Sequence, residues 1–450
     1  MRHLTSRTPG SAGVLLAGLF FAIAACTGVF AQDSRFNTVP HRSTMPAQPG
    51  GGSISQGPNT NVTNKSGPQS ETSVAVDPTN RMHVLTSVND LTSTAAVYES
   101  TDGGQSFVKS NFNPSGFCYD TWLAFNTNGD AFVSYECSDE RIAYKKHGQT
   151  TWTEIRLTNA GSFPDRDMVT IDNSPSSPFF GSVYVGYDDN GNNNAPYVLY
   201  SRDGFTNWTR SARIQNGNPT IGVNVATGPD GSVYATWEDY SGRQILTAKS
   251  SDGGATFGTA HVVTNYRMNT SSFFVFIPPQ NVRGIVPFPM TAVDESGSHP
   301  GRLYASYTDN DTSGSNTNIY VRYSDDGGTT WSAETKVNDD TNHAYHFHHS
   351  IAILSNGAVG VSFYDTRRDP NNRKTDRGFA YSTNGGSTFS KNIGITTKQS
   401  DETVGGFDGN QYGDYQGTAA DPGLGFHFSW TDSRTGTLNE DMFSGSIRQP

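Results

Sequence analysis

The sequence predicts an all-β fold, a β-propeller of four-stranded blades, on the strength of three observations. A short glycine-rich turn recurs along the chain, hairpins with alternating apolar residues recur beside it, and aromatic residues are abundant. The 450 residues include 26 Phe, 20 Tyr and 6 Trp, and aromatic side chains favour strands because they fit a pleated, half-buried surface. Internal repeats of this length indicate one structural unit used several times.

Composition and charge exclude several classes of protein. Glycine and proline, at 48 and 22 residues, are only modestly above ordinary usage, which excludes a collagen and a chain disordered throughout. The net charge is −11 and no basic stripe is visible, so neither nucleic acid nor an anionic membrane is expected as a partner. We expect a monomer.

The N-terminus, residues 1–31, is predicted to be an export signal. Two arginines precede an apolar run from Gly13 to Ala25, which is shorter than the roughly 20 residues that a membrane span needs. Cleavage before Gln32 by an ordinary signal peptidase and lipidation of Cys26 in a lipobox both fit this segment. No later segment is apolar enough to span a bilayer, so the protein is expected to be secreted or held in the cell envelope, in the second case by a lipid anchor at Cys26.

Residues 32–70 are rich in Ser, Pro, Gly, Asn, Gln and Thr and lack hydrophobic periodicity. Such a composition predicts a disordered linker. The propeller is therefore expected to occupy residues 71–450.

The recurring turn has the pattern Ser-x-Asp/Asn-Gly-x-x-x-aromatic. Glycine accepts the positive φ that a tight turn needs, the Asp or Asn side chain binds nearby backbone amides, and the aromatic ring packs between strands. Five clear copies and one degenerate copy occur, namely STDGGQSF at 100–107, SRDGFTNW at 201–208, SSDGGATF at 250–257, SDDGGTTW at 324–331, STNGGSTF at 382–389 and KHGQTTW at 146–152.

A hairpin precedes each of these turns. It consists of an apolar strand, a turn rich in Gly, Asn, Asp or Pro, and a second strand. Seven such hairpins predict seven blades, with six blades as the alternative if one repeat is miscounted, and the pattern does not indicate how the ring closes. The blades are expected at residues 71–112, 119–157, 165–214, 221–264, 288–338, 348–396 and 415–448.

The repeated turn resembles the Asp-box, or BNR repeat, of the sialidase superfamily, and the resemblance covers residues 71–448. It implies a β-propeller. Asp-box propellers include sialidases, xyloglucan-active enzymes and sortilin-type receptors, so the resemblance also implies a glycan or another cell-surface ligand as partner. Because one fold serves many functions, it does not by itself imply catalysis.

Strand order predicts where a site lies. The loops between strands one and two and between strands three and four share one face of a propeller, and the remaining loops share the other. The glycine-rich turns join strands three and four, so they are expected to be structural and to lie away from the channel mouth.

Residues at the start of strand one differ from repeat to repeat. Blade packing does not explain this variety, so we predict a site there, with a hydrated channel rim as the alternative. The aligned position is occupied by Glu71, Asp120, Arg166, Gly222, Phe288, His349 and Tyr415, and the preceding one by Ser70, Tyr119, Asp165, Ile221, Pro287, His348 and Asp414.

The chemistry that these residues suggest is glycoside hydrolysis. Glu71, Asp120 and Asp414 are candidates for its paired acid and base or nucleophile. The resemblance implies a different arrangement, with a tyrosine nucleophile, for which Tyr415 is the candidate beside Tyr119, and arginines on a substrate carboxylate. The substrate-binding candidates are Arg166, Asp167, Arg243, His348, His349, Arg367 and Arg434.

The chain differs from the family before its first blade, where Lys65-Ser66-Gly67-Pro68-Gln69 stands in place of an Arg-Ile-Pro motif. Two functions therefore stay open. One is a glycan-active hydrolase with a sialidase-like fold, and the other is a non-catalytic propeller that recognises a cell-surface glycan or protein.

No metal ligand is assigned, and calcium is the one cofactor left open. Four histidines between residues 343 and 349 suit a transition metal, with packing or solvated histidines as the alternative. The segment 309–314 resembles the start of a calcium loop, but Tyr320 occupies the place of its twelfth, acidic residue, so an Asn-rich turn is favoured.

Cys118 and Cys137 lie at similar distances before and after the turn of the second hairpin. Opposed residues of a hairpin come close enough for a disulfide, and export permits one. We predict that these two cysteines are bonded.

Overall fold

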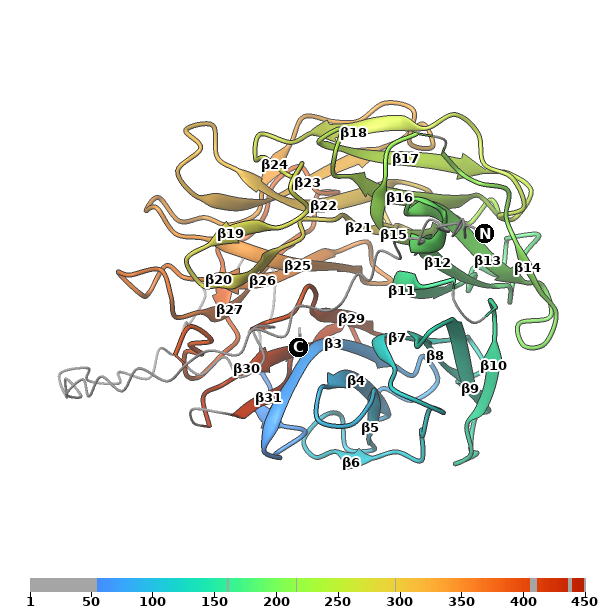
Figure 1. Cartoon of the computed structure of the whole chain (residues 1–450), viewed down its shortest axis with the longest axis horizontal. Helices are drawn as coiled ribbons and strands as arrows, with labels where there is room; N and C mark the ends of the chain where they lie inside the picture. The colour runs from blue at the N-terminus through green and yellow to red at the C-terminus, as the bar shows by residue number, and fades with distance from the viewer. Residues whose placement is uncertain are drawn as a thin grey trace, which may run out of the picture. The chain divides into compact units, whose positions relative to one another are not determined.

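The computed structural model describes residues 55–159, 162–215, 217–295, 297–404, 411–435 and 439–448, all of which belong to the unit formed by residues 42–450. The strands of this unit form seven antiparallel sets that follow one another around a ring in chain order (Figure 1). This is the predicted propeller, with seven blades rather than six. The predicted export signal and Cys26 lie outside the described residues.

The first four blades have four strands each, with the first strand of each innermost. In chain order they are β3 (Gly67–Val76), β4 (Val84–Asp90), β5 (Ala96–Ser100) and β6 (Val108–Lys109); β7 (Tyr119–Phe125), β8 (Ala131–Glu136), β9 (Glu140–Lys145) and β10 (Thr153–Arg156); β11 (Pro164–Ile171), β12 (Val183–Asp189), β13 (Ala195–Ser201) and β14 (Trp208–Arg210); and β15 (Thr220–Thr227), β16 (Val233–Asp239), β17 (Gln244–Ser250) and β18 (His261–Asn265).

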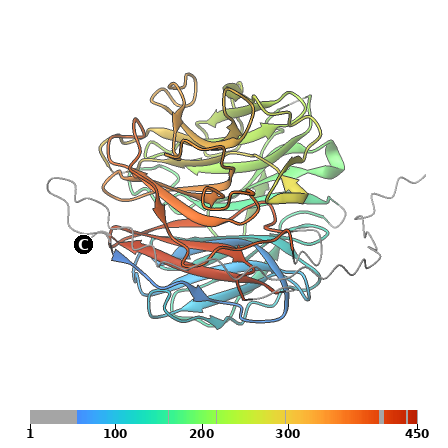
Figure 2. The ribbon, with the colours of Figure 1, turned by 90° about the vertical axis from the view of Figure 1, so that its left-hand side faces the viewer.

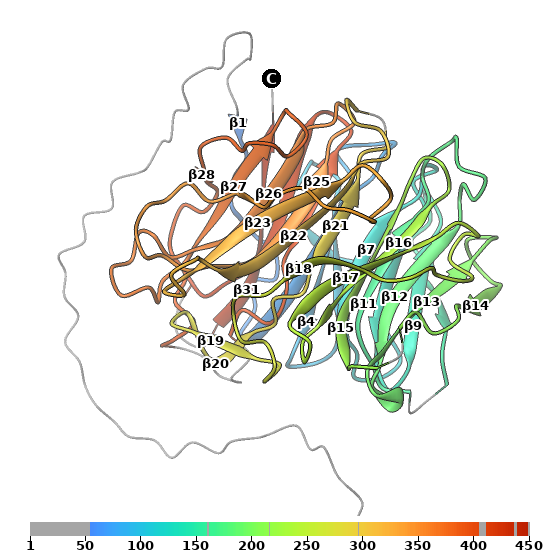
Figure 3. The same cartoon turned by 90° about the horizontal axis from the view of Figure 1, so that it is seen from above.

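The remaining blades follow a small insertion. The strands β19 (Val275–Ile277) and β20 (Gln280–Ile285) pair only with each other, and Figure 3 shows them as a separate hairpin. The last three blades contain β21 (Met290–Val293), β22 (Leu303–Asn310), β23 (Thr317–Ser324) and β24 (Thr335–Lys336); β25 (His346–Ile353), β26 (Val359–Asp365), β27 (Asp376–Ser382) and β28 (Ile393–Gly394); and β29 (Gly417–Asp421), β30 (Gly425–Asp432) and β31 (Asn439–Arg448).

The core lies between neighbouring blades. Each second strand of blades three to seven places a large, fully buried aromatic side chain two residues before an aspartate. These residues are Tyr187, Trp237, Tyr307, Phe363 and Trp430. Burying rings of this size dominates the packing energy of a core, so these equivalent aromatic residues hold neighbouring blades together.

The glycine-rich turns have the structure that their sequence predicts. In the first copy the Asp102 carboxylate accepts hydrogen bonds from the amides of Gln105 and Ser106, while the Ser100 hydroxyl accepts one from Gly104. The Ser106 hydroxyl and these amides lower the pKa of Asp102 to about 2. All the copies join strands three and four, so they lie on the face opposite the start of each first strand.

The ring closes through the N-terminal segment. β1 (Ser55–Gln56) and β2 (Thr60–Asn61) pair antiparallel with β31 and supply the outer edge of blade seven. The first residues of β31 also pair, in parallel, with the start of β3, so the first and last blades lie side by side (Figure 2). Residues 55–70, predicted as part of a disordered linker, therefore belong to the propeller. Their polar composition is that of an edge segment, which needs hydrogen bonds rather than an apolar face.

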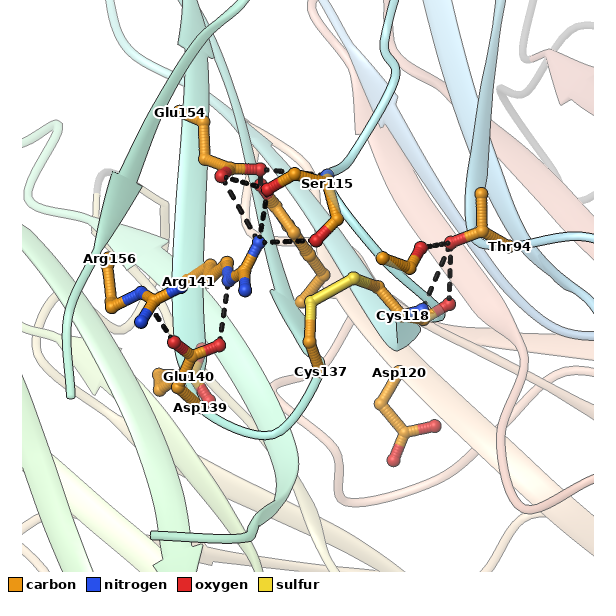
Figure 4. Close-up of a disulfide and its surroundings, with 12 residues drawn as sticks. Thr94, Ser115, Cys118, Asp120, Cys137, Asp139, Glu140, Arg141, Glu154 and Arg156 are labelled. Carbon is orange, nitrogen blue, oxygen red and sulfur yellow. Dashed lines mark hydrogen bonds and ion pairs between the residues drawn. A yellow bond between two sulfur atoms is a disulfide. The ribbon is translucent and has the colours of Figure 1, made fainter. Parts of the chain in front are cut away.

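The predicted disulfide between Cys118 and Cys137 is present. Tyr119 pairs with Glu136 in register, which places the two cysteines directly opposite one another just beyond the paired strands (Figure 4). Cys118 is fully buried.

We expect the double substitution Cys118→Ser and Cys137→Ser to lower the free energy of unfolding by about 3 kcal/mol, because the bond closes a loop of moderate length in the unfolded chain. Thermal unfolding with and without reductant measures this. An unchanged melting temperature in reductant, or two free thiols in the denatured, unreduced protein, would contradict it.

The only helix among the described residues is the three-residue η1 (Asn190–Asn192). No helix in this part of the chain is long and apolar enough to cross a membrane.

Candidate functional site

The aligned positions at the start of strand one are β-bulges. The pairing of β3, β7, β11, β15 and β25 with their second strands shifts register there. Glu71, Asp120 and Arg166 adopt φ values of 58°, 53° and 61°, which cost non-glycine residues roughly 1–2 kcal/mol each. A bulge changes the direction of one side chain. The side chains of these three polar residues therefore do not follow the regular alternation between the two faces of the strand.

The alignment needs one correction. In blade six the bulge residue is His348, with φ 44°, rather than His349. The first residue that resumes the regular pairing is Ser350, so the sequence alignment was displaced by one residue in this blade.

A cavity of about 430 Å³ opens at the channel mouth, beside these bulges. The predicted site residues that line it are Glu71, Tyr119, Asp120, Asp165, Arg166, Ile221 and Asp414. The charged residues in its wall that were not predicted are Glu136 and Arg283. The structure thus brings together three of the four predicted catalytic residues.

Glu71 is the most deeply buried of these three residues. It is 5% exposed, and its carboxylate accepts hydrogen bonds from the amide of Asp414, at 3.0 Å, and from the side chain of Asn89. Burial, followed by the charges of Asp120 and Asp414, raises the pKa of Glu71 well above its usual range. Glu71 therefore keeps its proton to a higher pH than an ordinary carboxyl group.

Asp414 has the opposite environment. Its two carboxylate oxygens accept hydrogen bonds from Nε and Nη2 of Arg283, at 3.2 and 2.6 Å, in the bidentate geometry of a strong ion pair. The same Nη2 atom lies 3.8 Å from Oε1 of Glu71. One guanidinium therefore spans two carboxyl groups, and it comes from β20 of the inserted hairpin.

Aromatic side chains form the rim of the cavity. Tyr119, Phe163, Phe273 and Phe274 line it, and Phe163 is 59% exposed. The Phe273 and Phe274 rings meet edge to face with centroids 4.7 Å apart, and the guanidinium of Arg283 lies 5.0 Å from the Phe274 ring. Exposed rings beside a polar floor offer a flat apolar face to a ligand.

Arg166 lies in the floor of the cavity. Its guanidinium is held between the rings of Phe288 and Tyr415, at 3.7 and 4.0 Å from their centroids. The residue is 2% exposed, and its three guanidinium nitrogens have no hydrogen-bond partner among the described residues. Arg166 can therefore donate to a ligand that reaches the floor.

Tyr415 does not have the geometry of a nucleophile. It packs beneath Arg166 and against Trp122, it does not line the cavity, and its hydroxyl donates to the carbonyl oxygen of Thr121 at 3.4 Å. Burial, reinforced by the charges of Asp120 and Glu71, raises its pKa well above the usual range. An activated phenolate would need the opposite shift.

The other predicted substrate-binding residues lie outside this cavity. Asp167 is buried behind the wall, and His348 and His349 line a small second cavity beside Asp414. Burial lowers the pKa of His349 to about 3, so this imidazole stays neutral.

The three remaining arginines serve turns. Arg243 donates to backbone carbonyls, among them those of Arg267 and Met268. Arg367 binds Asp339 and Asp365, and Arg434 binds Asp432. The arginine cluster that the family resemblance implies is therefore not assembled from these residues.

Neither sequence pattern considered for a metal forms a site. The Asp309 carboxylate accepts hydrogen bonds from the amides of Arg267 and Met268. The Asp311 carbonyl and carboxylate accept from the amides of Gly314 and Ser315, each at 3.1 Å, as in the favoured turn. His346 is fully buried between Asp340 and Asp365, while His343 lies elsewhere, 3.2 Å from the Ser315 hydroxyl.

Arg283, Glu136 and the three phenylalanines of the rim, Phe163, Phe273 and Phe274, were not predicted from the sequence. The available signal was the long connection between blades four and five, residues 265–287, which is rich in Phe and belongs to no strand–turn–strand repeat. Glu136 is the last residue of a second strand, directly before Cys137. The alignment that predicted the site at the channel mouth covers only the first strands, so it does not include Glu136.

No protein-family model and no curated protein matches the sequence. Among solved structures, the fold is similar to a protein of unknown function from Dyadobacter fermentans, with a TM-score of 0.48 and 11% identity over 88% of this chain and 99% of that one. It is also similar to the intramolecular trans-sialidase of Ruminococcus gnavus, with a TM-score of 0.47 and 12% identity over 67% and 91%. A leech intramolecular trans-sialidase gives a TM-score of 0.46 and 12% identity over 72% and 69%. These similarities concern the fold alone.

Proposed function

We propose that this chain is a glycoside hydrolase that binds its glycan in the cavity at the channel mouth, with Glu71 as the general acid. The observation that carries the proposal is the raised pKa of Glu71 beside the ion-paired carboxylate of Asp414. Glycoside hydrolysis needs one carboxyl group that keeps its proton and one that is ionised. Asp414, which is held by Arg283, would act as base or nucleophile, and Asp120 would help to raise the pKa of Glu71.

The charge of the cavity favours neutral or basic sugars over sugar acids. Five carboxyl groups and two arginines line it, and one of the arginines, Arg283, is paired with Asp414. A substrate carboxylate would enter this surplus of acidic groups with only Arg166 to receive it. Hydroxyl groups of a neutral sugar would instead find acceptors in the wall and donors on Arg166.

The aromatic rim supports a glycan as the ligand class. Phe163 at the rim and Phe276 on the inserted hairpin are 59% and 63% exposed, and such rings present apolar faces on which the C–H face of a sugar can pack. The same rim also suits the second candidate function, a recognition module that holds a glycan without cleaving it.

The proposal places the protein outside the cytoplasm, as a secreted or cell-envelope protein. The disulfide between Cys118 and Cys137 supports this, because such bonds persist in oxidising compartments. Mass spectrometry of the mature N-terminus separates free secretion from a lipid anchor at Cys26.

A screen of fluorogenic glycosides, run beside a glycan array, tests the proposed function. We expect turnover of a neutral or amino-sugar glycoside and none of a sialoside. Binding on the array without turnover of any glycoside would favour the recognition module, and turnover confined to sialosides would overturn the argument from charge.

A further inference from the structure

Three carboxyl groups meet in the wall between blades two and three. Asp120 extends from β7, Glu136 ends β8, and Asp165 begins β11. One ligand oxygen from each lies within 4.8 Å of the others, and all three residues line the cavity. Carboxylates this close repel one another unless a cation or shared protons lie among them.

Glu140 adds a fourth, deeper carboxyl group. It pairs with Glu136 in the register of β8 and β9, so both side chains leave the same face of the sheet, with Cβ atoms about 4.5–5.5 Å apart. Glu140 is 0% exposed, and its carboxylate oxygens have no side-chain partner among the described residues. Its strongest electrostatic neighbours are Asp167 and Asp120, so it lies close to the side of the cluster that Asp120 and its strand partner Glu136 form.

The arginines nearest in the chain do not neutralise this cluster. Arg141 binds Asp139 and Glu154, and Arg156 binds Asp139, on the side away from Asp120 (Figure 4). Arg166 is held between aromatic rings without a hydrogen bond to any of the carboxylates. A buried carboxylate without a partner is costly. Glu140 is such a group, behind three partly buried carboxyl groups, so a cation among the four would stabilise them.

The cluster is also held in place from behind. The disulfide joins Cys118, two residues before Asp120, to Cys137, directly after Glu136. Asn89 donates to Oδ1 of Asp120 at 3.1 Å and accepts from its amide at 2.8 Å, and Asp120 also shares a hydrogen bond with the carboxyl group of Glu71. Partners of this kind orient the ligands of metal sites.

We propose that Asp120, Glu136 and Asp165 bind a calcium ion, with Glu140 as the buried carboxylate behind it. Oxygen ligands alone select a hard cation, and calcium accepts the irregular carboxylate geometry that magnesium does not. The ion would close the seam between blades two and three and face the cavity. Calcium binding can be measured without any sugar, so the site is testable apart from the proposed glycosidase activity. Because Asp120 is shared, bound calcium would offset part of the acidic surplus of the cavity and part of the effect of Asp120 on Glu71.

Calorimetric titration of the chelator-treated full chain with calcium chloride tests the proposal, together with thermal unfolding in calcium and in magnesium. We expect one site with a dissociation constant at or below about 10⁻³ M, a melting temperature raised by calcium, and a smaller effect of magnesium. Glu136→Gln and Asp165→Asn should each weaken binding at least tenfold. Glu402→Gln, a buried carboxyl away from the cavity, is the matched control and should bind as the parent does.

The variants are first compared without calcium, where a cooperative melt establishes that each is folded. Absence of calcium-dependent heat and stabilisation would overturn the proposal, and so would unchanged affinity in both ligand variants. If mild acid stabilises the protein while calcium does not, shared protons hold the cluster together and the site is not a metal site.

Discussion

Replacing Glu71 by glutamine is expected to lower glycoside turnover by about 10²–10⁴-fold, the range that loss of a positioned general acid causes. Glutamine keeps the shape and one acceptor oxygen, so the amide of Asp414 retains its partner. The substrate should still bind, because the rim and Arg166 are unchanged. Steady-state kinetics should therefore show a fall in kcat larger than any change in KM.

The pH profile gives the same prediction a second readout. A general acid must hold its proton, so parent activity should fall as pH rises through the pKa of Glu71, which lies well above the usual value. In Glu71→Gln this alkaline limb should disappear. Glu402→Gln is the matched control, because burial also raises the pKa of Glu402 to about 7 but its side chain does not line the cavity. Equal losses of turnover in both variants would contradict the assignment.

Removing residues 1–64 is expected to destabilise the propeller by several kcal/mol, since each lost hydrogen bond contributes about 1 kcal/mol. The deleted part includes the closing segment, residues 55–64, whose amides at Gly57 and Val62 donate to β31 at 2.8 Å. It also includes the side chains of Asn61 and Thr63, which donate to the buried Asp441. The exposed edge of β31 should in addition promote aggregation.

A truncation that removes only residues 1–54 is the control, because every contact described here is kept. Denaturant unfolding followed by tryptophan fluorescence should give the parent midpoint for this control and a clearly lower one for the longer truncation. Asp441→Ala in the full chain should lie between them. Equal midpoints for both truncations would show that the closing segment does not hold the ring.

Most of the fold could be predicted from local signals. The Asp102 turn and its copies connect strands three and four through hydrogen bonds between residues that are three or four positions apart. A pattern confined to so few residues can be recognised in the sequence. Ring closure was not predictable, because β1 pairs with β31 almost the whole length of the chain away. The residues of β1 and β2 are polar, and they form strands because they pair with β31.

The site could be predicted in part for the same reason. Glu71, Asp120 and Arg166 share a bulge at one place in each repeat, so aligning the repeats finds them. Arg283 lies on an insertion that follows no repeat, and its ion pair with Asp414 spans 131 residues. The buried state of Tyr415 depends on Arg166 and Trp122 from other blades, and one strand does not reveal it.

A crystal structure of Glu71→Gln soaked with the best glycoside tests the central claim most directly, because the variant should bind substrate without consuming it. We predict a sugar in the cavity, with its glycosidic oxygen beside residue 71 and Asp414 and its ring against the aromatic rim. A sugar bound only at the glycine-rich turns on the opposite face would contradict the account.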